Sequence, residues 1–321
     1  MYKINDILLS DYGISPAKAN GTNLALSGFL DMPARLGKTF HSWGDEHGIE
    51  PYVAASEINL GGRTLTFNGL LKAIDRADAI AKIQVLENAI SNFTGLVVFV
   101  TPFSRHDVYV KEAIQVAYLG DGWASISLKL QEPFISFGNA ILTSDGDTIT
   151  DSDNNAILFA VAPMSGTEAG IYTIDGLAFG SFGAFLRQSN GLLDSAATKE
   201  QEFTSYQTEG YQLTKRQANE IEIDLVFKAE SFAGLKSNIA DFQNLLTAPG
   251  LRVLNVDGYN RSCFVIDGFT VQGIFVLDGI SIALLSVSFL MASALEITPK
   301  QILTSDGDLI LTSDSDALLY N

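Results

Sequence analysis

Aspartates dominate the first group of residues whose types and spacing could support chemistry. The segment Ile-Leu-Thr-Ser-Asp-Gly-Asp occurs at residues 141–147 and again at 302–308. Calcium takes several oxygen ligands, and Asp-x-Asp spacing supplies them, but the third ligand and the twelfth-position Glu of an EF-hand are missing. Tight turns between short β-segments are therefore the favoured interpretation. The aspartates concerned are Asp145, Asp147, Asp151, Asp153, Asp306, Asp308, Asp314 and Asp316.

A second group lies in one short stretch that contains His41, Asp45, Glu46 and His47. A loop of this kind could hold a zinc ion or supply an acid and a base. Its spacing does not match the helical His-Glu-x-x-His arrangement of zinc proteases, and the second half of the chain has no counterpart. A solvated loop is the favoured interpretation.

The third group is the adjacent pair His106-Asp107, which suggests a catalytic dyad without a recognisable nucleophile. The sequence has no Gly-x-Ser-x-Gly elbow and no phosphate-binding glycine loop. Cys263 is the single cysteine, so neither an intramolecular disulfide nor a multi-cysteine metal site can form. The sequence therefore predicts no enzyme, and it assigns no catalytic, cofactor-binding or metal-binding residue.

The elements that would position these residues occur twice in the chain. Residues 141–159 and 302–320 match at 12 of 19 positions, at an offset of 161. That period is far longer than the roughly 20–50 residues of a solenoid or propeller unit, so a whole domain repeats. We expect two domains, at residues 1–160 and 161–321, each ending in the Asp-rich segment.

The clearest correspondence between the two copies has an offset of 156. Residues 65–71 and 221–227 alternate in polarity, as half-buried strands do. Residues 74–92 and 230–248 then carry apolar side chains at i, i+4, i+7 and i+11, which predicts one helix in each copy with its apolar face on the sheet.

Most of the remaining chain has the pattern of strands and hairpins. Asp-Gly at Asp121-Gly122 and Asp278-Gly279 lies between alternating runs, which is a strong hairpin signal. Residues 14–57 and 184–219 are rich in turn-forming residues and indicate long loops with up to two strands. We predict an α+β fold, mainly antiparallel β, with two tandem homologous β-sandwich or barrel domains that each pack one helix on a sheet.

The composition excludes several function classes. The net charge is −17 and Lys and Arg do not cluster, which argues against sequence-specific nucleic-acid binding. The N-terminus lacks a signal-peptide pattern, so synthesis in the cytoplasm is expected. Residues 279–295 carry no charge and approach the length of a membrane span. Their counterpart at 124–130 alternates like a strand, so we predict a buried strand and no membrane partner.

The architecture resembles the tube-like domains of phage tails, and in particular distal tail and baseplate hub proteins. The resemblance covers residues 3–134 and 172–294 at the level of element order, in a chain that carries the domain twice and is acidic. The Leu-Thr-Ser-Asp-Gly-Asp segment also looks like short repeats at the ends of phage tail proteins. The sequence shows no separate carbohydrate-binding insertion of the kind that some distal tail proteins carry.

The resemblance implies a structural protein of the virion tail or of a prophage, assembled in the bacterial cytoplasm, with neighbouring tail or baseplate proteins as partners. Three chains with two domains each would form a homotrimeric, pseudo-hexameric ring around an acidic lumen that DNA could pass without binding. A hexamer of chains is the variant of this arrangement. The resemblance carries over no binding residue and no cofactor.

A binding module is the competing hypothesis. In this case the chain would be a monomeric tandem β-sandwich adhesin or glycan-binding protein that recognises its ligand through the loops at 37–51 and 187–210. Aromatic side chains in or near these loops could stack on sugars. They are Trp43 and Tyr52 in the first half, and Tyr206 and Tyr211 in the second.

Overall fold

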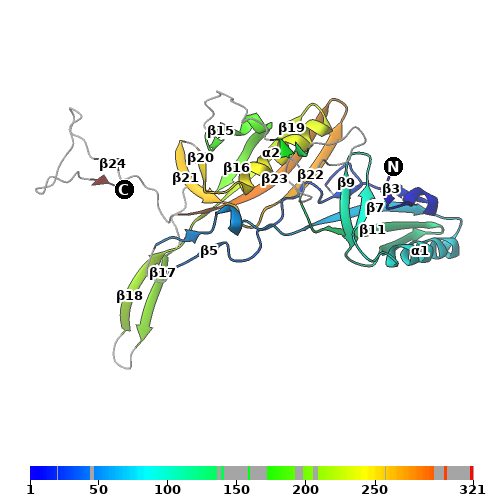
Figure 1. The fold of residues 1–321 in the computed structure, drawn as a ribbon, viewed down its shortest axis with the longest axis horizontal. Coiled ribbons are helices and arrows are strands. Elements are labelled where there is room, and N and C mark those ends of the chain that lie inside the picture. The colour runs from blue at the N-terminus through cyan, green and yellow to red at the C-terminus, as the bar shows by residue number, and fades with distance from the viewer. Residues whose placement is uncertain are drawn as a thin grey trace, which may run out of the picture.

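The computed structural model shows a mostly antiparallel β protein with two helices among its described residues (Figure 1). These are residues 1–19, 21–43, 47–135, 139–140, 158–159, 172–191, 198–204, 209–256, 258–292, 300–301 and 319–320. Both copies of the Asp-rich segment, 141–147 and 302–308, lie outside them. The choice between turns and calcium ligands therefore stays a prediction, as do the domain limits 1–160 and 161–321.

The first half forms a nine-stranded sheet in the order β2-β1-β8-β9-β11-β7-β3, with β10 on β11 and β4 on β7. The strands are β1 Lys3–Ile4, β2 Ile7–Leu8, β3 Ile14–Pro16, β4 Leu26–Ser27, β7 Arg63–Lys72, β8 Val97–Val100, β9 Arg105–Val110, β10 Gln115–Gly120 and β11 Trp123–Glu132. The long β7–β11 pairing brings Leu65 opposite Leu130 and Phe67 opposite Leu128. These alternating apolar residues face the core, as the period of two predicts.

The second half forms an eight-stranded sheet in the order β15-β14-β20-β21-β23-β19-β16, with β22 on β23. Its strands are β14 Thr173–Ile174, β15 Leu177–Ala178, β16 Ala184–Asn190, β19 Glu220–Ala229, β20 Arg252–Val256, β21 Tyr259–Phe264, β22 Phe269–Leu277 and β23 Ile280–Met291. Element for element, this order repeats that of the first half. All pairings between the strands of both sheets are antiparallel.

Each sheet curls at one corner. In the first half, β9 and β11 share only two residue pairs, Leu130 with Val110 and Gln131 with Tyr109. In the second half, β21 and β23 share only Cys263 with Met291 and Phe264 with Leu290. A strand that pairs so briefly at the end of its neighbour turns the sheet through a corner. The prediction of a mainly antiparallel β fold is confirmed, in the form of curled half-barrels.

One helix follows the long central strand in each half, as predicted. Helix α1 spans Arg76–Ser91 and α2 spans Phe232–Thr247. Each begins at a side-chain cap, because Asp75 accepts from the Asp78 amide at 2.8 Å and Ser231 accepts from the Gly234 amide at 3.1 Å. The buried residues lie at the predicted spacing. They are Ala79, Ile83, Leu86 and Ile90 in α1, and Leu235, Ile239, Phe242, Gln243 and Leu246 in α2.

The uncharged stretch near residue 280 is a strand, as predicted. Strand β23 alternates buried and half-buried residues along its whole length. Within the described residues, no helix is long and apolar enough to cross a membrane.

The prediction of long loops with up to two strands at residues 14–57 and 184–219 needs a correction, because both stretches contain more than two strands. Residues 184–190 form β16, and the segment that follows contains β17 Thr198–Thr204 and β18 Glu209–Arg216, which pair as a long hairpin. This hairpin extends away from the sheet (Figure 1). In the first half, the same place in the order holds two-residue strands, β5 Phe40–His41 and β6 Glu50–Pro51, paired as a hairpin. Outside the two large sheets, β12 Asn139–Ala140 pairs with β13 Leu158–Phe159, and β24 Lys300–Gln301 with β25 Leu319–Tyr320.

Candidate functional site

His106 and Asp107 do not form the dyad that their adjacency suggests. They are neighbours on β9, so their side chains point to opposite faces, and His106 is buried while Asp107 is exposed. His106 Nδ1 instead lies 3.0 Å from Glu132 Oε1, and its Nε2 lies 2.8 Å from Ser104 Oγ. The histidine is a satisfied structural residue.

Glu132 connects His106 to Arg63 in a buried ionic cluster. The Arg63 Nε atom lies 2.5 Å from Glu132 Oε2, and both side chains are about nine-tenths buried. Burial opposes ionisation of Glu132, but the hydrogen bond to His106 and the Arg63 charge outweigh it, so the pKa of Glu132 is lowered. Removing one partner from such a cluster leaves an unpaired buried charge, which destabilises the fold. The three side chains therefore act as one structural unit.

His41, Trp43 and Tyr52 lie in the β5–β6 hairpin or next to it. The rings of His41 and Trp43 meet edge to face at 4.1 Å, and Trp43 Nε1 donates to Glu50 Oε2 at 3.0 Å. Lys38 Nζ lies 2.8 Å from His41 Nδ1 and also lies over the Tyr52 ring, 5.4 Å from its centroid. These side-chain contacts thus hold the hairpin together.

Some of the predicted residues cannot be placed in this way. Asp45, Glu46 and Tyr206 lie outside the described residues, and the side chain of Tyr211 is also outside. Among the described residues, no three His, Cys, Asp or Glu side chains gather as a metal site would require. Cys263 is fully buried, and burial raises the pKa of its thiol to about 12, so it is an unreactive core residue.

A further candidate surface is the joint between the halves. It is made by a segment of the first half that we call the first arm, residues 29–62, of which 44–46 are outside the described residues. The arm begins after Gly28, whose positive φ of 84° directs the chain away from the sheet. A Cβ at this position would collide with the carbonyl oxygen of Thr64, so glycine is required.

The start of the first arm pairs with strand β22 of the second half. Met32 and Phe269 exchange two backbone hydrogen bonds, at 2.9 and 3.0 Å. The Asp31 carboxylate accepts from the Val271 amide at 2.8 Å. Burial raises the pKa of Asp31, against the opposing effects of this hydrogen bond and of Arg63. The first arm therefore covers the outer edge of a strand that would otherwise be free.

A loop just before the first arm lengthens this contact. Asn23 donates from Nδ2 to the Val276 carbonyl at 2.5 Å and accepts from the Val276 amide at 2.9 Å. Its own backbone amide donates to the Ile274 carbonyl at 3.2 Å. One asparagine thus matches the backbone groups of β22 as a strand would.

Helix α2 is the second element that the joint buries. Gln243 is buried, and its Nε2 donates to the Leu30 carbonyl at 2.8 Å. The Phe232 ring lies 6.2 Å from Phe29 and 5.2 Å from Phe103, edge to face in both cases. Lys236 Nζ donates to the Phe103 carbonyl at 2.7 Å, and burial lowers its pKa, with a further contribution from Arg63. Aromatic packing and satisfied polar groups together fix the two halves.

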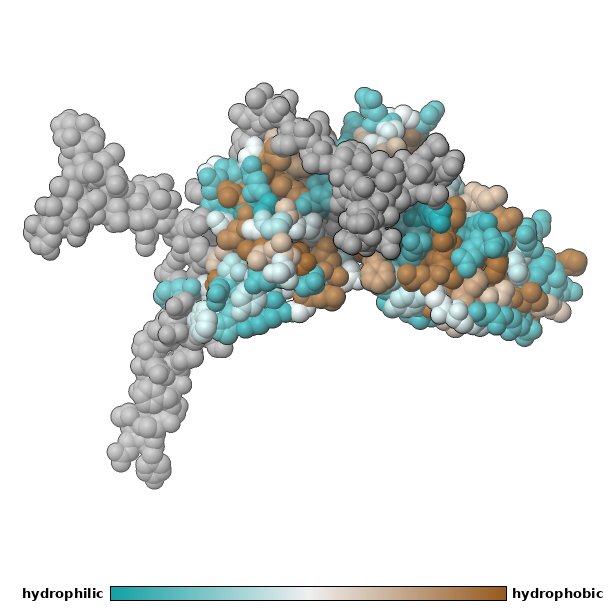
Figure 2. All heavy atoms as spheres, viewed as in Figure 1, coloured by the Kyte–Doolittle hydropathy of each residue, from teal (hydrophilic) through white to brown (hydrophobic). Residues whose placement is uncertain are grey.

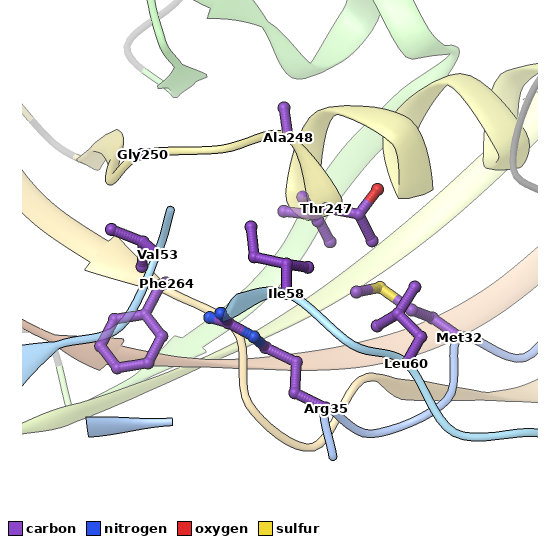
Figure 3. Close-up of a pocket in the computed structure, with 10 residues that line it drawn as sticks. Met32, Arg35, Val53, Ile58, Leu60, Thr247, Ala248, Gly250 and Phe264 are labelled. Carbon is purple, nitrogen blue, oxygen red and sulfur yellow. The ribbon is translucent and has the colours of Figure 1, made fainter. Parts of the chain in front are cut away.

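The first arm also fills the space between the C-terminus of α2 and strand β21. Figure 3 shows side chains of the first arm facing Phe264 and the last turn of α2. Those of the arm are Met32, Arg35, Val53, Ile58 and Leu60, and those of the second half include Leu246, Thr247 and Ala248. They leave a cavity of about 10 Å³, which is about the space of one water molecule. We call this filled place the second-half seat.

The first half has an open groove at the end of α1. Its volume is about 980 Å³. The lining comes from the last turns of α1, the segment between α1 and β8, the end of β9 and the residues before β10. It comprises Glu87, Asn88, Ile90, Ser91, Phe93, Thr94, Gly95, Leu96, Tyr109, Val110, Lys111, Glu112, Ala113 and Ile114. We call it the first-half groove. Figure 2 shows hydrophobic residues at the surface of both halves, interspersed with hydrophilic ones.

The sequence analysis missed both of these places, although one signal was present. Gly28-Phe29-Leu30-Asp31 recurs as Gly191-Leu192-Leu193-Asp194. Gly191 has a φ of 79°, and a Cβ there would collide with the Glu220 carbonyl oxygen, which lies in β19 where Thr64 lies in β7. The two glycines are equivalent, and each marks the point at which the chain leaves its sheet.

Comparisons with known proteins do not assign the chain to a family. No family model matches the chain, and no curated protein matches it in sequence. Among solved structures, it is similar to the SPP1 Dit (gp 19.1) protein, described as a paradigm of the hub adsorption apparatus in phages that infect Gram-positive bacteria. The identity is 8%, the TM-score is 0.33, and the match covers 90% of this chain and 98% of that one. A TM-score of 0.33 is too low to assign the fold.

Proposed function

We propose that this protein is a structural, ring-forming component at the distal end of a phage or prophage tail, as a distal tail or baseplate hub protein. The observation that carries the proposal is the identity of strand order in the two halves, with one helix after the central strand in each. Two copies of one domain in a chain are suited to build a ring with more domains than chains.

The joint between the halves supports a head-to-tail ring. The first arm uses one surface of the first half to contact a different surface of the second half, along β22 and α2. Contacts between unlike surfaces of like domains are heterologous, and they form a closed ring when the rotation per domain is right. Three chains supply six domains, which gives a homotrimeric pseudo-hexamer. Six chains in one ring are the variant.

The charge of the chain fits this role. With a net charge of −17, a ring would present an acidic surface to its lumen and to solvent. Like charge repels the phosphate backbone of DNA, so DNA would pass without being retained. The partners in this proposal are further copies of the chain and the neighbouring tail or baseplate proteins.

The test is the absolute mass of the purified chain, measured by light scattering on a sizing column over a range of concentrations. The proposal predicts a species of three times the 34.6 kDa chain mass, with six-lobed rings in negative-stain images. Six chain masses with twelve lobes would indicate the hexameric variant.

A chain that stays monomeric at the highest concentration and gives no rings would contradict the proposal. Binding of that monomer to a glycan array, independent of salt, would then favour the adhesin or glycan-binding alternative. Trp43→Ala provides the matched probe for that outcome, because Trp43 is an exposed aromatic residue of the first arm.

A further inference from the structure

The second-half seat and the first-half groove are the same place in two copies of one fold. The pairings of β9 with β11 and of β21 with β23 place Tyr109 where the second half has Phe264. At the offset of 156, Glu87 of α1 occupies the position of Gln243 in α2. The two sites are therefore comparable residue by residue.

They differ in whether anything fills them. Phe264 is 3% exposed under the first arm, whereas Tyr109 is 43% exposed. Gln243 is buried and bonded to Leu30, whereas Glu87 lines open space. The volume is about 10 Å³ in the seat and about 980 Å³ in the groove. The first-half groove thus corresponds to the second-half seat, but no described segment of the chain fills it.

The strands beside the two sites differ in the same way. Strand β22 pairs with β23 on one side and is covered on the other by the first arm and by the loop before it. Strand β10 is its counterpart and pairs with β11, which is its sole strand partner among the described residues. Almost all of β10 is exposed, including Tyr118 and Leu119. A free edge next to a groove lined by both apolar and polar residues is suited to receive an added segment of chain.

The chain carries a second segment built like the first arm. It starts after Gly191, at the point equivalent to Gly28, and runs to Asn219 at the start of β19. We call it the second arm. Its first residues repeat the Leu-Asp of the first arm, and it carries the β17–β18 hairpin, which extends away from its own sheet (Figure 1).

We infer that the first-half groove and the edge of β10 bind the second arm of another copy of this chain. The inference deepens the proposed function and rests on it, because it names the contact by which one chain joins the next. The first arm joins the two halves within a chain, and the second arm joins the second half of one chain to the first half of the next. Contacts of one kind then run around the ring.

The test uses two variants and a matched control. In the groove variant, Leu96→Asp and Tyr109→Asp place charge at two exposed apolar residues that line the groove. In the arm-less variant, residues 198–216 are replaced by a short Gly-Ser linker. The control is Ile74→Asp combined with Val85→Asp. These two residues are 89% and 57% exposed and lie outside the groove lining.

We expect the groove variant and the arm-less variant each to remain monomeric at concentrations where the natural chain and the control form rings. Thermal unfolding of each monomer verifies that it folds. An equimolar mixture of the two variants provides the decisive result. The groove variant keeps its arm and the arm-less variant keeps its groove, so the mixture should form a 1:1 dimer that grows no further.

Several results would overturn the inference. Rings from either single variant, equal loss of rings in the control, or no dimer in the mixture would each show that the groove does not receive the arm. Rings from the natural chain together with rings from the groove variant would reject this contact and leave the proposed function standing. A natural chain that forms no rings would reject both.

A disulfide between copies gives an independent reading. Leu96→Cys combined with Gln201→Cys places one thiol in the groove and one in β17, and the buried Cys263 does not compete. Oxidation should link chains with both substitutions into a covalent ring of three. Chains with only one of the two substitutions should form no such ring. Oxidation products that join the groove thiols of two copies to each other, or a linkage within one monomer, would contradict the inference.

Discussion

The two halves have the same strand order, yet corresponding positions carry side chains suited to different surroundings. Gln243 and Glu87 occupy one helix position, and Phe264 and Tyr109 occupy one strand position. In the second half these residues are buried by the first arm, and there they are an uncharged amide and a phenylalanine. In the first half they line an open groove, and there they are a carboxylate and a tyrosine. The residue type at each of these positions therefore reflects whether the first arm covers it, as well as its place in the fold.

The sharpest way to break this comparison is to truncate the matched aromatic residues. Phe264→Ala removes a buried ring under the first arm, and we expect it to lower the free energy of unfolding by about 3–5 kcal/mol. Tyr109→Ala in the monomer should change it by about 0.5 kcal/mol or less, as exposed substitutions do. Urea denaturation at low protein concentration measures both. Equal losses would show that the two places are not differently filled.

The matched helix residues give a smaller difference. Gln243→Ala leaves the Leu30 carbonyl without its donor in a buried place, and we expect a loss of about 1–3 kcal/mol. Glu87→Ala should stay within about 0.5 kcal/mol. The same denaturation experiment compares the two variants. A loss at Glu87 as large as that at Gln243 would mean that the groove position is already engaged in the monomer.

The helix caps should show where the halves behave alike. Asp75→Ala and Ser231→Ala each remove an oxygen that accepts from an amide in the first turn. Each should cost about 1 kcal/mol. Thermal unfolding, with Asp75→Asn and Ser231→Thr as the conservative controls, measures the pair. Values that differ several-fold would show that the helix starts are not equivalent.

The smallest effect should be confined to acid. Glu132 in the ionic cluster of the first half has Met291 as its counterpart in the second. The folded-state pKa of Glu132 is lowered below its ordinary 4.5, so its stabilisation is fully present above that value and is lost as pH falls through the folded-state pKa. The raised pKa of Asp31 acts in the opposite direction, because its charged form is the costly one.

Amide hydrogen exchange below pH 4.5 tests this difference between the halves. Exchange in β9 and β11 should rise before exchange in β21 and β23. Glu132→Gln should flatten the dependence on pH, whereas Asp107→Asn, on the exposed face of β9, should leave it unchanged. A simultaneous rise in both halves would contradict the assignment to Glu132.

The local part of this structure could be predicted from the sequence. Both helices and the long strands β7, β11, β19 and β23 lie where the periodicity placed them, because helix and strand periods are local patterns. The uncharged stretch of β23 was correctly read as a strand because its polar residues keep a period of two.

The site could not be predicted in the same way. The ionic cluster joins Arg63, His106 and Glu132 across three strands. The adjacency of His106 and Asp107, to which no catalytic role is assigned, does not reveal this cluster, because neighbours on a strand face opposite ways. The joint depends on contacts such as Leu30 with Gln243, which lie 213 residues apart in the sequence. The one local sequence signal for the arms is the pair of equivalent glycines, Gly28 and Gly191, after which the arms begin.

The location of the first arm and its seat in the same chain has a consequence for the order of events during assembly. A tethered contact acts at a high effective concentration, so the joint between the halves forms with the fold, whatever the amount of protein. In the proposed ring, only the contacts made by the second arm depend on dilution. A six-domain ring of three chains would then need two encounters between molecules, and the third contact would close the ring within the assembly.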